Sequence, residues 1–157
     1  MSKLYVRIDD RLIHGQIVTS WVKTLDIKRI IAIDDTIAGN EMMKSIVTMG
    51  VPSHIESLVI KKSQLVDYLD SDKVTLIIVR FARDLDSLFE YLKDAVHINI
   101  GNCSKQANPV LTTKAKGVGQ LLSFTQEDVD TLDRYDNYGT EVIAQQLPMD
   151  KITTWKH

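Results

Sequence analysis

Cysteine is almost absent from the sequence, and this scarcity limits the covalent chemistry that is open to the chain. Cys103 is the only cysteine, so no disulfide can form within the chain. It lies in a polar segment without a neighbouring base, which argues against a thiol nucleophile. His54 and His97 have apolar neighbours and no metal-ligand spacing to Cys103 or to a second histidine. We therefore expect no metal site and no cofactor.

Long hydrophobic runs and an excess of one charge are also missing. The longest aliphatic stretches, such as Leu76 to Val79, have the length of a strand and are far shorter than the roughly 20 residues of a membrane-spanning helix. The N-terminal residues lack the apolar stretch and cleavage site of a signal peptide. The net charge is −2, without blocks of like charge, which argues against nucleic-acid or membrane-surface partners. These absences predict a cytoplasmic protein.

The organisation of the chain indicates one domain over residues 1–157. Its composition, 44% hydrophobic and 25% charged, is typical of a globular protein, and we find no internal repeat or linker. Strand and helix patterns alternate along the chain. This alternation predicts an α/β fold, a doubly wound and mostly parallel sheet with helices on both faces.

The periodicity of apolar residues places the individual elements. Strands are predicted at residues 4–8, 29–33, 55–60, 74–79, 96–100 and 141–147, with shorter pieces near 111 and 121–123 and turns at Gly117 and Gly119. Helices are predicted at residues 16–25 and 40–49, after Ser63 and Asp84 as caps, and after Thr125, where Asp128 completes a capping box. The helix over 40–49 is expected to turn four residues inward: Met42, Met43, Ile46 and Val47.

The first strand and the helix after it enclose the most informative segment. His14 and Gly15 lie where the chain enters the N-terminus of this helix, and such a terminus attracts anions. Arg7 and Arg11 stand nearby, and guanidinium groups suit phosphate oxygens. A neutral imidazole nitrogen in this setting can attack phosphorus, so His14 is the candidate phosphoryl carrier. Arg11 and the backbone N–H groups of Gly15 and Gln16 are the candidate phosphate ligands; the alternative is an ordinary surface histidine among local ion pairs.

The remaining charged residues of this segment have two interpretations each. Asp10 either orients the imidazole or Arg11, or forms a loop salt bridge or Asx-turn. We assign Asp9 a structural role. Arg7 either reaches the phosphate or pairs with an aspartate.

Polar residues follow several of the predicted strands. Because ligands of such folds sit at the carboxyl ends of the strands, these residues are expected to gather in one place. They are Asp9 to His14, Asp34-Asp35, Arg80-Phe81 and Gly101-Asn102. An acidic pair such as Asp34-Asp35 can hold Mg²⁺ in receiver-type domains, but a solvated loop or a helix-initiating pair is the preferred interpretation.

The run RIDDRLIHGQ, residues 7–16, which continues to Trp21, resembles a known signature. It is similar to the active-site motif of the IIB component of the mannose/fructose/sorbose family of the bacterial phosphoenolpyruvate-dependent sugar phosphotransferase system. Asp34-Asp35 and residues 99–101 and 146–150 also look like family features. The resemblance implies a sheet of about seven strands and an open active site. It also implies that His14 is the residue that is phosphorylated, at Nδ1.

The same resemblance implies a transferase with several partners. A phosphohistidine of a IIA protein would donate the phosphoryl group, and the sugar imported through the membrane components IIC and IID would accept it. The chain would then be cytoplasmic and peripherally associated with the membrane complex. Exposed Leu12 and Ile13 would help docking, unless both pack under the loop.

Two rival functions and two properties remain open at this point. One rival is a stand-alone histidine phosphatase or phosphotransferase, which needs a deep cavity beside His14. The other is a regulatory binding module that is phosphorylated without passing the group on. The identity of the sugar and the oligomeric state, including a homo-oligomer, are not determined by the sequence.

Overall fold

The fold is built around one mixed sheet, seen in a computed structural model that describes residues 3–15, 17–103, 106, 108–114 and 121–155. Seven strands form this sheet in the order β3-β2-β4-β1-β5-β8-β9, and β6 pairs with β7 in a separate hairpin. The strands are β1 (Leu4–Asp9), β2 (Arg29–Ile33), β3 (Glu56–Ile60), β4 (Thr75–Val79), β5 (Ile98–Asn102), β6 (Leu111–Lys114), β7 (Leu121–Phe124), β8 (Val142–Ala144) and β9 (Thr153–Thr154).

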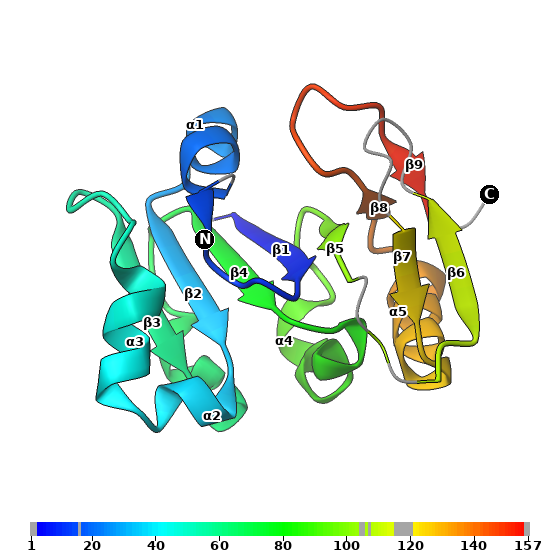
Figure 1. The fold of residues 1–157 in the computed structure, drawn as a ribbon, viewed down its shortest axis with the longest axis horizontal. Coiled ribbons are helices and arrows are strands. Elements are labelled where there is room, and N and C mark those ends of the chain that lie inside the picture. The colour runs from blue at the N-terminus through cyan, green and yellow to red at the C-terminus, as the bar shows by residue number, and fades with distance from the viewer. Residues whose placement is uncertain (1–2, 16, 104–105, 107, 115–120, 156–157) are drawn as a thin grey trace.

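All pairings in the large sheet are parallel except that of β9 with β8. The predicted mostly parallel sheet of about seven strands is confirmed. In Figure 1 the β6–β7 hairpin stands at the end of the molecule opposite to β3. The hairpin confirms the two strand pieces that were predicted near 111 and 121–123, while the predicted turns at Gly117 and Gly119 lie outside the described residues.

Helical segments connect the strands. They are η1 (Ile17–Trp21), a π-helical turn that continues into α1 (Val22–Leu25), α2 (Asp35–Ala38), α3 (Glu41–Thr48), η2 (Lys62–Tyr68), η3 (Ala82–Leu88), α4 (Phe89–Leu92) and α5 (Gln126–Tyr138). The capping box of Thr125 and Asp128 forms as predicted. The helices predicted to begin after Ser63 and Asp84 begin earlier, as 3₁₀ turns at Lys62 and Ala82.

Two apolar cores form because strand residues alternate between the two faces of the sheet. On one face, Val6 and Ile8 of β1 pack with residues of η2, η3, α4 and α5. On the other face, Tyr5 packs with residues of the segments that follow β1 and β2, including Ile17 and Ile37. The sheet is therefore covered by helices on both faces, as the sequence predicts.

The expectation for helix α3 was wrong. The helix forms, with the Asn40 side chain capping it, but Met42 is 74% exposed and Ile46 59% exposed. Only Val47 of the four predicted inward residues packs against the sheet core. The reason is the position of α3 at the edge of the sheet. It contacts α2 and the edge strand β3, so part of its apolar surface has no sheet residues to pack against.

The last predicted strand is shorter than residues 141–147 because a polar loop begins at Gln145. The Gln145 side chain donates hydrogen bonds to the carbonyl oxygens of Pro148 and Asp150, at 3.0 and 2.9 Å. The Asp150 carboxylate in turn accepts from the Leu147 N–H at 2.9 Å. This loop lies beside η1, because the Trp21 Nε1–H donates to the Gln146 carbonyl oxygen at 2.8 Å.

Candidate functional site

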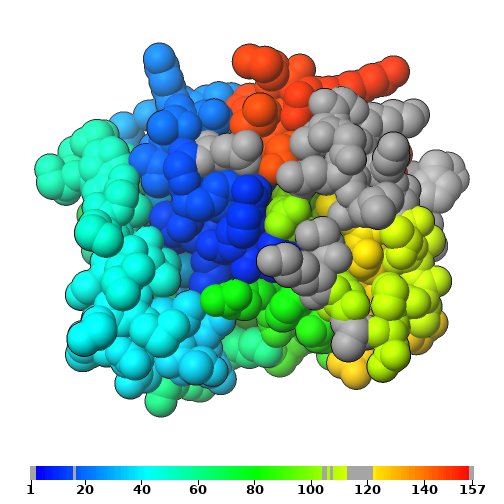
Figure 2. Space-filling model, in the orientation of Figure 1, coloured from blue at the N-terminus to red at the C-terminus, as the bar shows by residue number. Residues whose placement is uncertain are grey.

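The site lies at the carboxyl end of β1, the strand between β4 and β5. Space-filling Figure 2 shows the blue N-terminal strand and loop at the centre of one face of the molecule. The register of β1 against β5 shifts between Ile8 and Asp9, so Asp9 pairs with Asn102 instead of Gly101. Asp9 is fully buried, so the site contains a carboxylate without access to solvent.

The Asp9 carboxylate is shared by three basic side chains. Its Oδ2 lies 2.8 Å from His14 Nε2 and 3.5 Å from Arg7 Nε. Its Oδ1 accepts from the Arg11 backbone N–H at 3.0 Å and lies 3.4 Å from Arg11 Nε. Burial raises the pKa of Asp9, but the hydrogen bond and attraction of His14, followed by the charge of Arg7, outweigh it, so the pKa lies below its usual value.

This ionised carboxylate selects the tautomer of His14. A carboxylate only accepts hydrogen bonds, so the proton of the neutral imidazole stays on Nε2, which donates to Asp9. Nδ1 then carries the lone pair, and it has no hydrogen-bond partner among the described residues. The His14 side chain is 17% exposed, so the ring reaches the surface while Nε2 points inward.

A tight loop returns His14 to Asp9. The Leu12 N–H donates to the Asp9 carbonyl oxygen, and Leu12 has a φ of +54°, in the left-handed region. Leu12 is buried and Ile13 partly buried, so both pack under the loop, and the expected exposed docking pair does not form. The helical segment then begins directly after His14, because the N–H groups of Ile17 and Val18 both donate to the His14 carbonyl oxygen.

Arg7 is not positioned as a phosphate ligand. It is almost fully buried, and Nη1 and Nη2 donate to the carbonyl oxygens of Gln145 and Gln146, at 3.2 and 3.1 Å. Desolvation by burial lowers the pKa of Arg7 to about 10, still well above neutrality. Of the two interpretations, the structure supports pairing with an aspartate, because the buried Arg7 Nε lies 3.5 Å from Asp9 Oδ2.

Gly101 makes room for Arg7. A Cβ atom at residue 101 would lie 2.3 Å from both Cζ and Nη2 of Arg7, closer than any real contact. The Arg7 guanidinium also lies over the Trp21 ring, 5.4 Å from the ring centroid. Trp21 and the backbone carbonyl groups of Gln145 and Gln146 thus surround the Arg7 guanidinium behind Asp9.

Among the described residues it is Asp9, not the candidate Asp10, whose carboxylate hydrogen-bonds to the imidazole. The Asn102 Nδ2 donates to the Asp10 carboxylate, and the Asp10 N–H donates to the Asn102 carbonyl oxygen at 2.9 Å. Arg80 Nη1 donates to the Asp10 carbonyl oxygen at 3.0 Å. The register shift that turns Asp9 inward leaves Asp10 as the first residue of the loop.

Two of the other candidate phosphate ligands, Arg11 and Gly15, are exposed to solvent. The Arg11 side chain is 42% exposed, and Gly15 is exposed at the start of the helical segment. Gln16 lies outside the described residues. Of the two arginines of the motif, Arg11 is the one that combines contact with Asp9 and access to solvent.

The Asp34-Asp35 pair initiates a helix, which was one of the two interpretations preferred to a Mg²⁺ site. Asp34 caps α2 by accepting from the Ile37 N–H at 2.9 Å, and Asp35 accepts from the Lys62 N–H at 2.8 Å. The remaining Asp34 oxygen accepts from Arg80 Nε at 2.8 Å. The strand ends of β1, β2, β4 and β5 are therefore joined in one polar network. In the described part of the chain, no three histidine, cysteine, aspartate or glutamate side chains converge to hold a metal ion.

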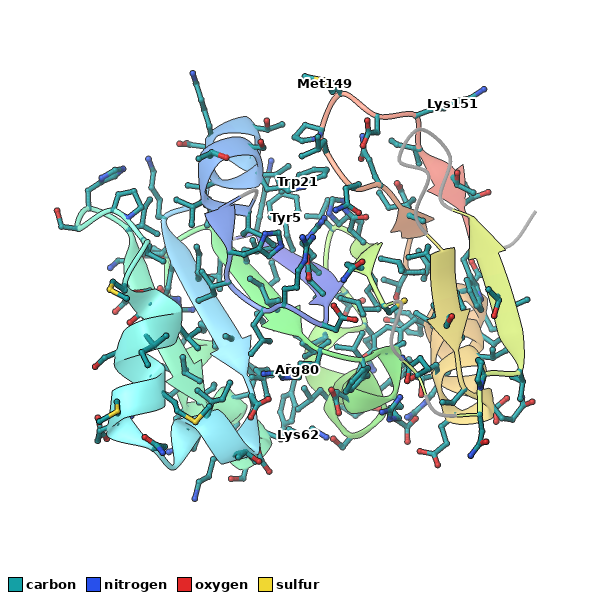
Figure 3. All side chains as sticks on the ribbon, in the orientation of Figure 1. Tyr5, Trp21, Lys62, Arg80, Met149 and Lys151 are labelled. Atoms are coloured by element: carbon teal, nitrogen blue, oxygen red, sulfur yellow. The ribbon has the colours of Figure 1, made fainter. Side chains whose placement is uncertain are left out.

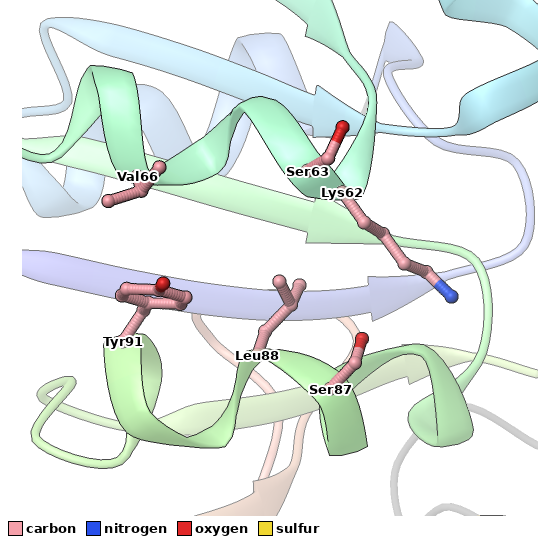
Figure 4. Close-up of a pocket in the computed structure, with 6 residues that line it drawn as sticks. All are labelled: Lys62, Ser63, Val66, Ser87, Leu88 and Tyr91. Carbon is pink, nitrogen blue, oxygen red and sulfur yellow. The ribbon is translucent and has the colours of Figure 1, made fainter.

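Two of the hollows in the described part of the structure share Lys62 in their lining. The first, between η2 and the η3–α4 segment, is drawn in Figure 4 with its lining residues Lys62, Ser63, Val66, Ser87, Leu88 and Tyr91. The second is lined by residues at the ends of β2 and β4 and by Lys62; Arg80 and Lys62 are labelled on the same side of the molecule in Figure 3. His14 lines neither, so neither is the deep cavity beside the ring that a stand-alone enzyme would need.

Comparison with known proteins decides the family. Residues 3–157 match the family described as the PTS system sorbose subfamily IIB component. The chain belongs to this family. A fructose-specific EIIB component of Bacillus subtilis (strain 168) is 28% identical to this IIB chain over 154 residues, which cover 96% of the chain and 91% of that protein.

Solved structures agree with the family assignment. A protein titled as a phosphoenolpyruvate-dependent phosphotransferase system is 28% identical, with a TM-score of 0.80 and coverage of 99% of this chain and 95% of that one. The IIBSor domain of the sorbose permease from Klebsiella pneumoniae has a TM-score of 0.82 at 20% identity, with coverage of 98% and 93%, and supports the fold. The resemblance seen in residues 7–16 is therefore confirmed at the level of the family. No helix in the described residues is both long and apolar enough to cross a bilayer.

Proposed function

We propose that this IIB component carries a phosphoryl group on His14. The group would come from a phosphohistidine of a IIA partner and pass to a sugar imported through the membrane components IIC and IID. The observation that carries the proposal is the 2.8 Å contact between His14 Nε2 and the buried Asp9 carboxylate. This contact holds the ring in one orientation and leaves the lone pair of Nδ1 available at the surface.

Nδ1 is the proposed nucleophile. Its lone pair forms the new N–P bond while the N–P bond of the donor histidine breaks and returns its electron pair to that ring. During the attack the Nε2 proton stays between the imidazole and Asp9, so the positive charge that develops on His14 lies against a carboxylate. In the second transfer the sugar oxygen bonds to phosphorus, the N–P bond of His14 breaks, and the hydroxyl proton is released.

Arg11 is the proposed ligand of the transferred phosphoryl group. The transition state places negative charge on the equatorial oxygens, which a guanidinium group can bind. The Arg11 side chain is partly exposed beside His14, while its backbone N–H is held by Asp9. The exposed backbone of Gly15 lets a bulky donor approach closely. Asp9, Asp10 and Arg7 would support this arrangement from behind without touching the phosphoryl group.

A phosphoryl-transfer assay tests the proposal. The chain is incubated with radiolabelled phosphoenolpyruvate, enzyme I, HPr and a matched IIA protein, beside the variants His14→Ala and His54→Ala. His54 is exposed and far along the chain in a turn, so its variant is the matched control. We expect an acid-labile, alkali-stable label on the wild type and on His54→Ala, and none on His14→Ala. Equal label on His14→Ala would place the acceptor elsewhere, and an unlabelled wild type with a proven donor would refute the carrier function.

Two further readouts separate this function from its rivals. Transfer of the label to sugar in the presence of membranes that contain IIC and IID would exclude a regulatory module that only stores the group. Nitrogen-15 NMR of the phosphorylated chain should show the phosphoryl group on Nδ1 and the proton on Nε2. Phosphorylation at Nε2 would contradict the role given to Asp9.

A further inference from the structure

Arg80 lies between the two acidic pairs that end β1 and β2. It directly follows Val79, which pairs with Ile8 of β1 on one side and with Ile33 of β2 on the other. This register brings the Arg80 side chain to the start of the His14 loop and to the start of α2. Sequence reasoning placed Arg80 at a strand end, but the pattern of residues could not show what it contacts.

The Arg80 guanidinium binds both neighbours at once. Nε donates to Asp34 Oδ2 at 2.8 Å, and Nη1 donates to the Asp10 carbonyl oxygen at 3.0 Å. Because the guanidinium group is planar and rigid, fixing Nε on one partner also fixes the direction of Nη1 toward the other. A lysine has one terminal nitrogen and cannot reproduce this geometry.

The anchor for Arg80 is itself held in place. Asp34 uses its second oxygen, Oδ1, to accept from the Ile37 N–H, so its carboxylate is fixed by the first turn of α2. Asp10 is held from the opposite side by Asn102 of β5. The first residue of the His14 loop is therefore clamped between β4 and β5.

We propose that Arg80 is a positioning residue for phosphoryl transfer, which it serves by holding the Asp10 carbonyl and thus the loop that returns His14 to Asp9. The inference rests on the proposed function of His14. Arg80 contacts neither the imidazole nor Asp9 in the described structure, and acts through the backbone of residues 10–13. Reacting groups displaced by about 1 Å can lose roughly a hundredfold in rate, so a loosened loop lowers the transfer rate while the donor still docks.

We call the two hydrogen bonds of Arg80, to Asp34 and to the Asp10 carbonyl oxygen, the clamp. Two variants break it in different ways. Arg80→Lys keeps the positive charge and loses the two-armed geometry. Asp34→Asn keeps the Oδ1 acceptor that caps α2 but presents an amide in place of the oxygen that binds Arg80 Nε. Arg134→Gln removes an arginine from the exposed ion pair with Asp86, on α5 and η3, and is the control for loss of a surface arginine.

Single-turnover transfer from a phosphorylated IIA protein is measured for each folded variant, with circular dichroism as the check on folding. We expect Arg80→Lys and Asp34→Asn to lower the maximal rate about tenfold or more, with the donor concentration at half-maximal rate changed less than about twofold. The double variant should be no slower than the slower single variant, because both break one clamp. Arg134→Gln should react at the wild-type rate.

The outcomes separate this inference from the function on which it rests. If the wild type is labelled and Arg80→Lys reacts at the wild-type rate, Arg80 acts by its charge alone and the positioning role is refuted. Additive losses in the double variant would also refute a single clamp. If the wild type is never labelled, the proposed function fails. In that case nitrogen-15 NMR of His14 still tests the clamp: both variants should lose the fixed Nε2–H tautomer, and an unchanged spectrum overturns the inference.

Discussion

Two Asp-Asp pairs lie at the carboxyl ends of β1 and β2, which are separated by β4 in the sheet, yet the two pairs have different environments. In the pair that ends β1, Asp9 is fully buried and holds three basic residues, including His14. In the pair that follows β2, Asp34 caps α2 and binds Arg80, while Asp35 is exposed. In the first pair Asp9 is the last residue of its strand and Asp10 begins a loop, whereas the second pair opens a helix. The same dipeptide thus supplies the buried carboxylate that binds His14 in one place and the cap of helix α2 in the other.

The difference teaches that the function of an acidic pair is set by its neighbours in space. Asp9 points into a region where Gly101 leaves room for the Arg7 guanidinium, so a buried positive charge stabilises a buried negative one. Asp34 has no comparable buried partner, because Arg80 is 38% exposed. We therefore expect substitutions in the first pair to have larger effects than those in the second.

The largest effect is expected for Asp9→Ala. It leaves the buried Arg7 guanidinium without its carboxylate, and breaking such a buried pair typically lowers the free energy of unfolding by about 3–5 kcal/mol. Urea unfolding measures the loss, with Asp35→Ala as the comparison, which removes only an exposed hydrogen bond to the Lys62 N–H and should cost about 1 kcal/mol. Equal effects of the two substitutions would contradict the comparison.

A smaller loss of stability is expected for Gly101→Ala, which disturbs the Arg7–Asp9 ion pair by displacing Arg7. The added Cβ would lie 2.3 Å from Arg7, so the guanidinium must move, and overpacking of this kind costs about 1–3 kcal/mol. Gly50→Ala is the control, because a Cβ there meets nothing within 4 Å. Urea unfolding of both variants measures the difference in the free energy of unfolding. If Gly101→Ala is as stable as Gly50→Ala, the Arg7 guanidinium can adopt another position without loss of stability, which would contradict the prediction.

Asp34→Ala should follow, with a loss of about 1 kcal/mol, because it removes the cap of α2 together with a partly buried ion pair. Asp34→Asn keeps the cap and should lose less in the same urea titration. If both variants were equally destabilised, the cap would not be the source of the stability.

The smallest effect is expected in the pH dependence of stability. Because the folded-state pKa of Asp9 lies below its usual value, Asp9 contributes stability at pH values above about 4 that is lost as the pH falls through the folded-state pKa. Burial opposes this contribution, so it is modest. The unfolding free energy of the wild type should therefore fall more steeply below pH 4 than that of Asp9→Asn. Parallel curves in urea titrations from pH 7 to pH 3 would contradict this expectation.

Much of the fold and part of the site could be predicted from local patterns. The alternation of apolar residues located the central strands and both faces of the sheet, and the polar strand ends were correctly expected to gather at one edge. The prediction for α3 was wrong because periodicity reports an apolar stripe but not whether a sheet lies beneath it, and Met42 and Ile46 are exposed. The two-residue strand β9 has too little pattern to be seen in sequence.

The sequence by itself determined the family, through residues 7–16, and the parallel α/β architecture, because a motif and a hydrophobic period are local properties of the chain. Only the tertiary structure decided that Asp9 rather than Asp10 meets His14, that Arg7 is buried against the carbonyl groups of residues 145 and 146, and that Arg80 joins the ends of β1 and β2. The physical reason is that these contacts depend on a register shift at Ile8 and on strand order. Both are set by packing between segments distant in the chain, which no local pattern records.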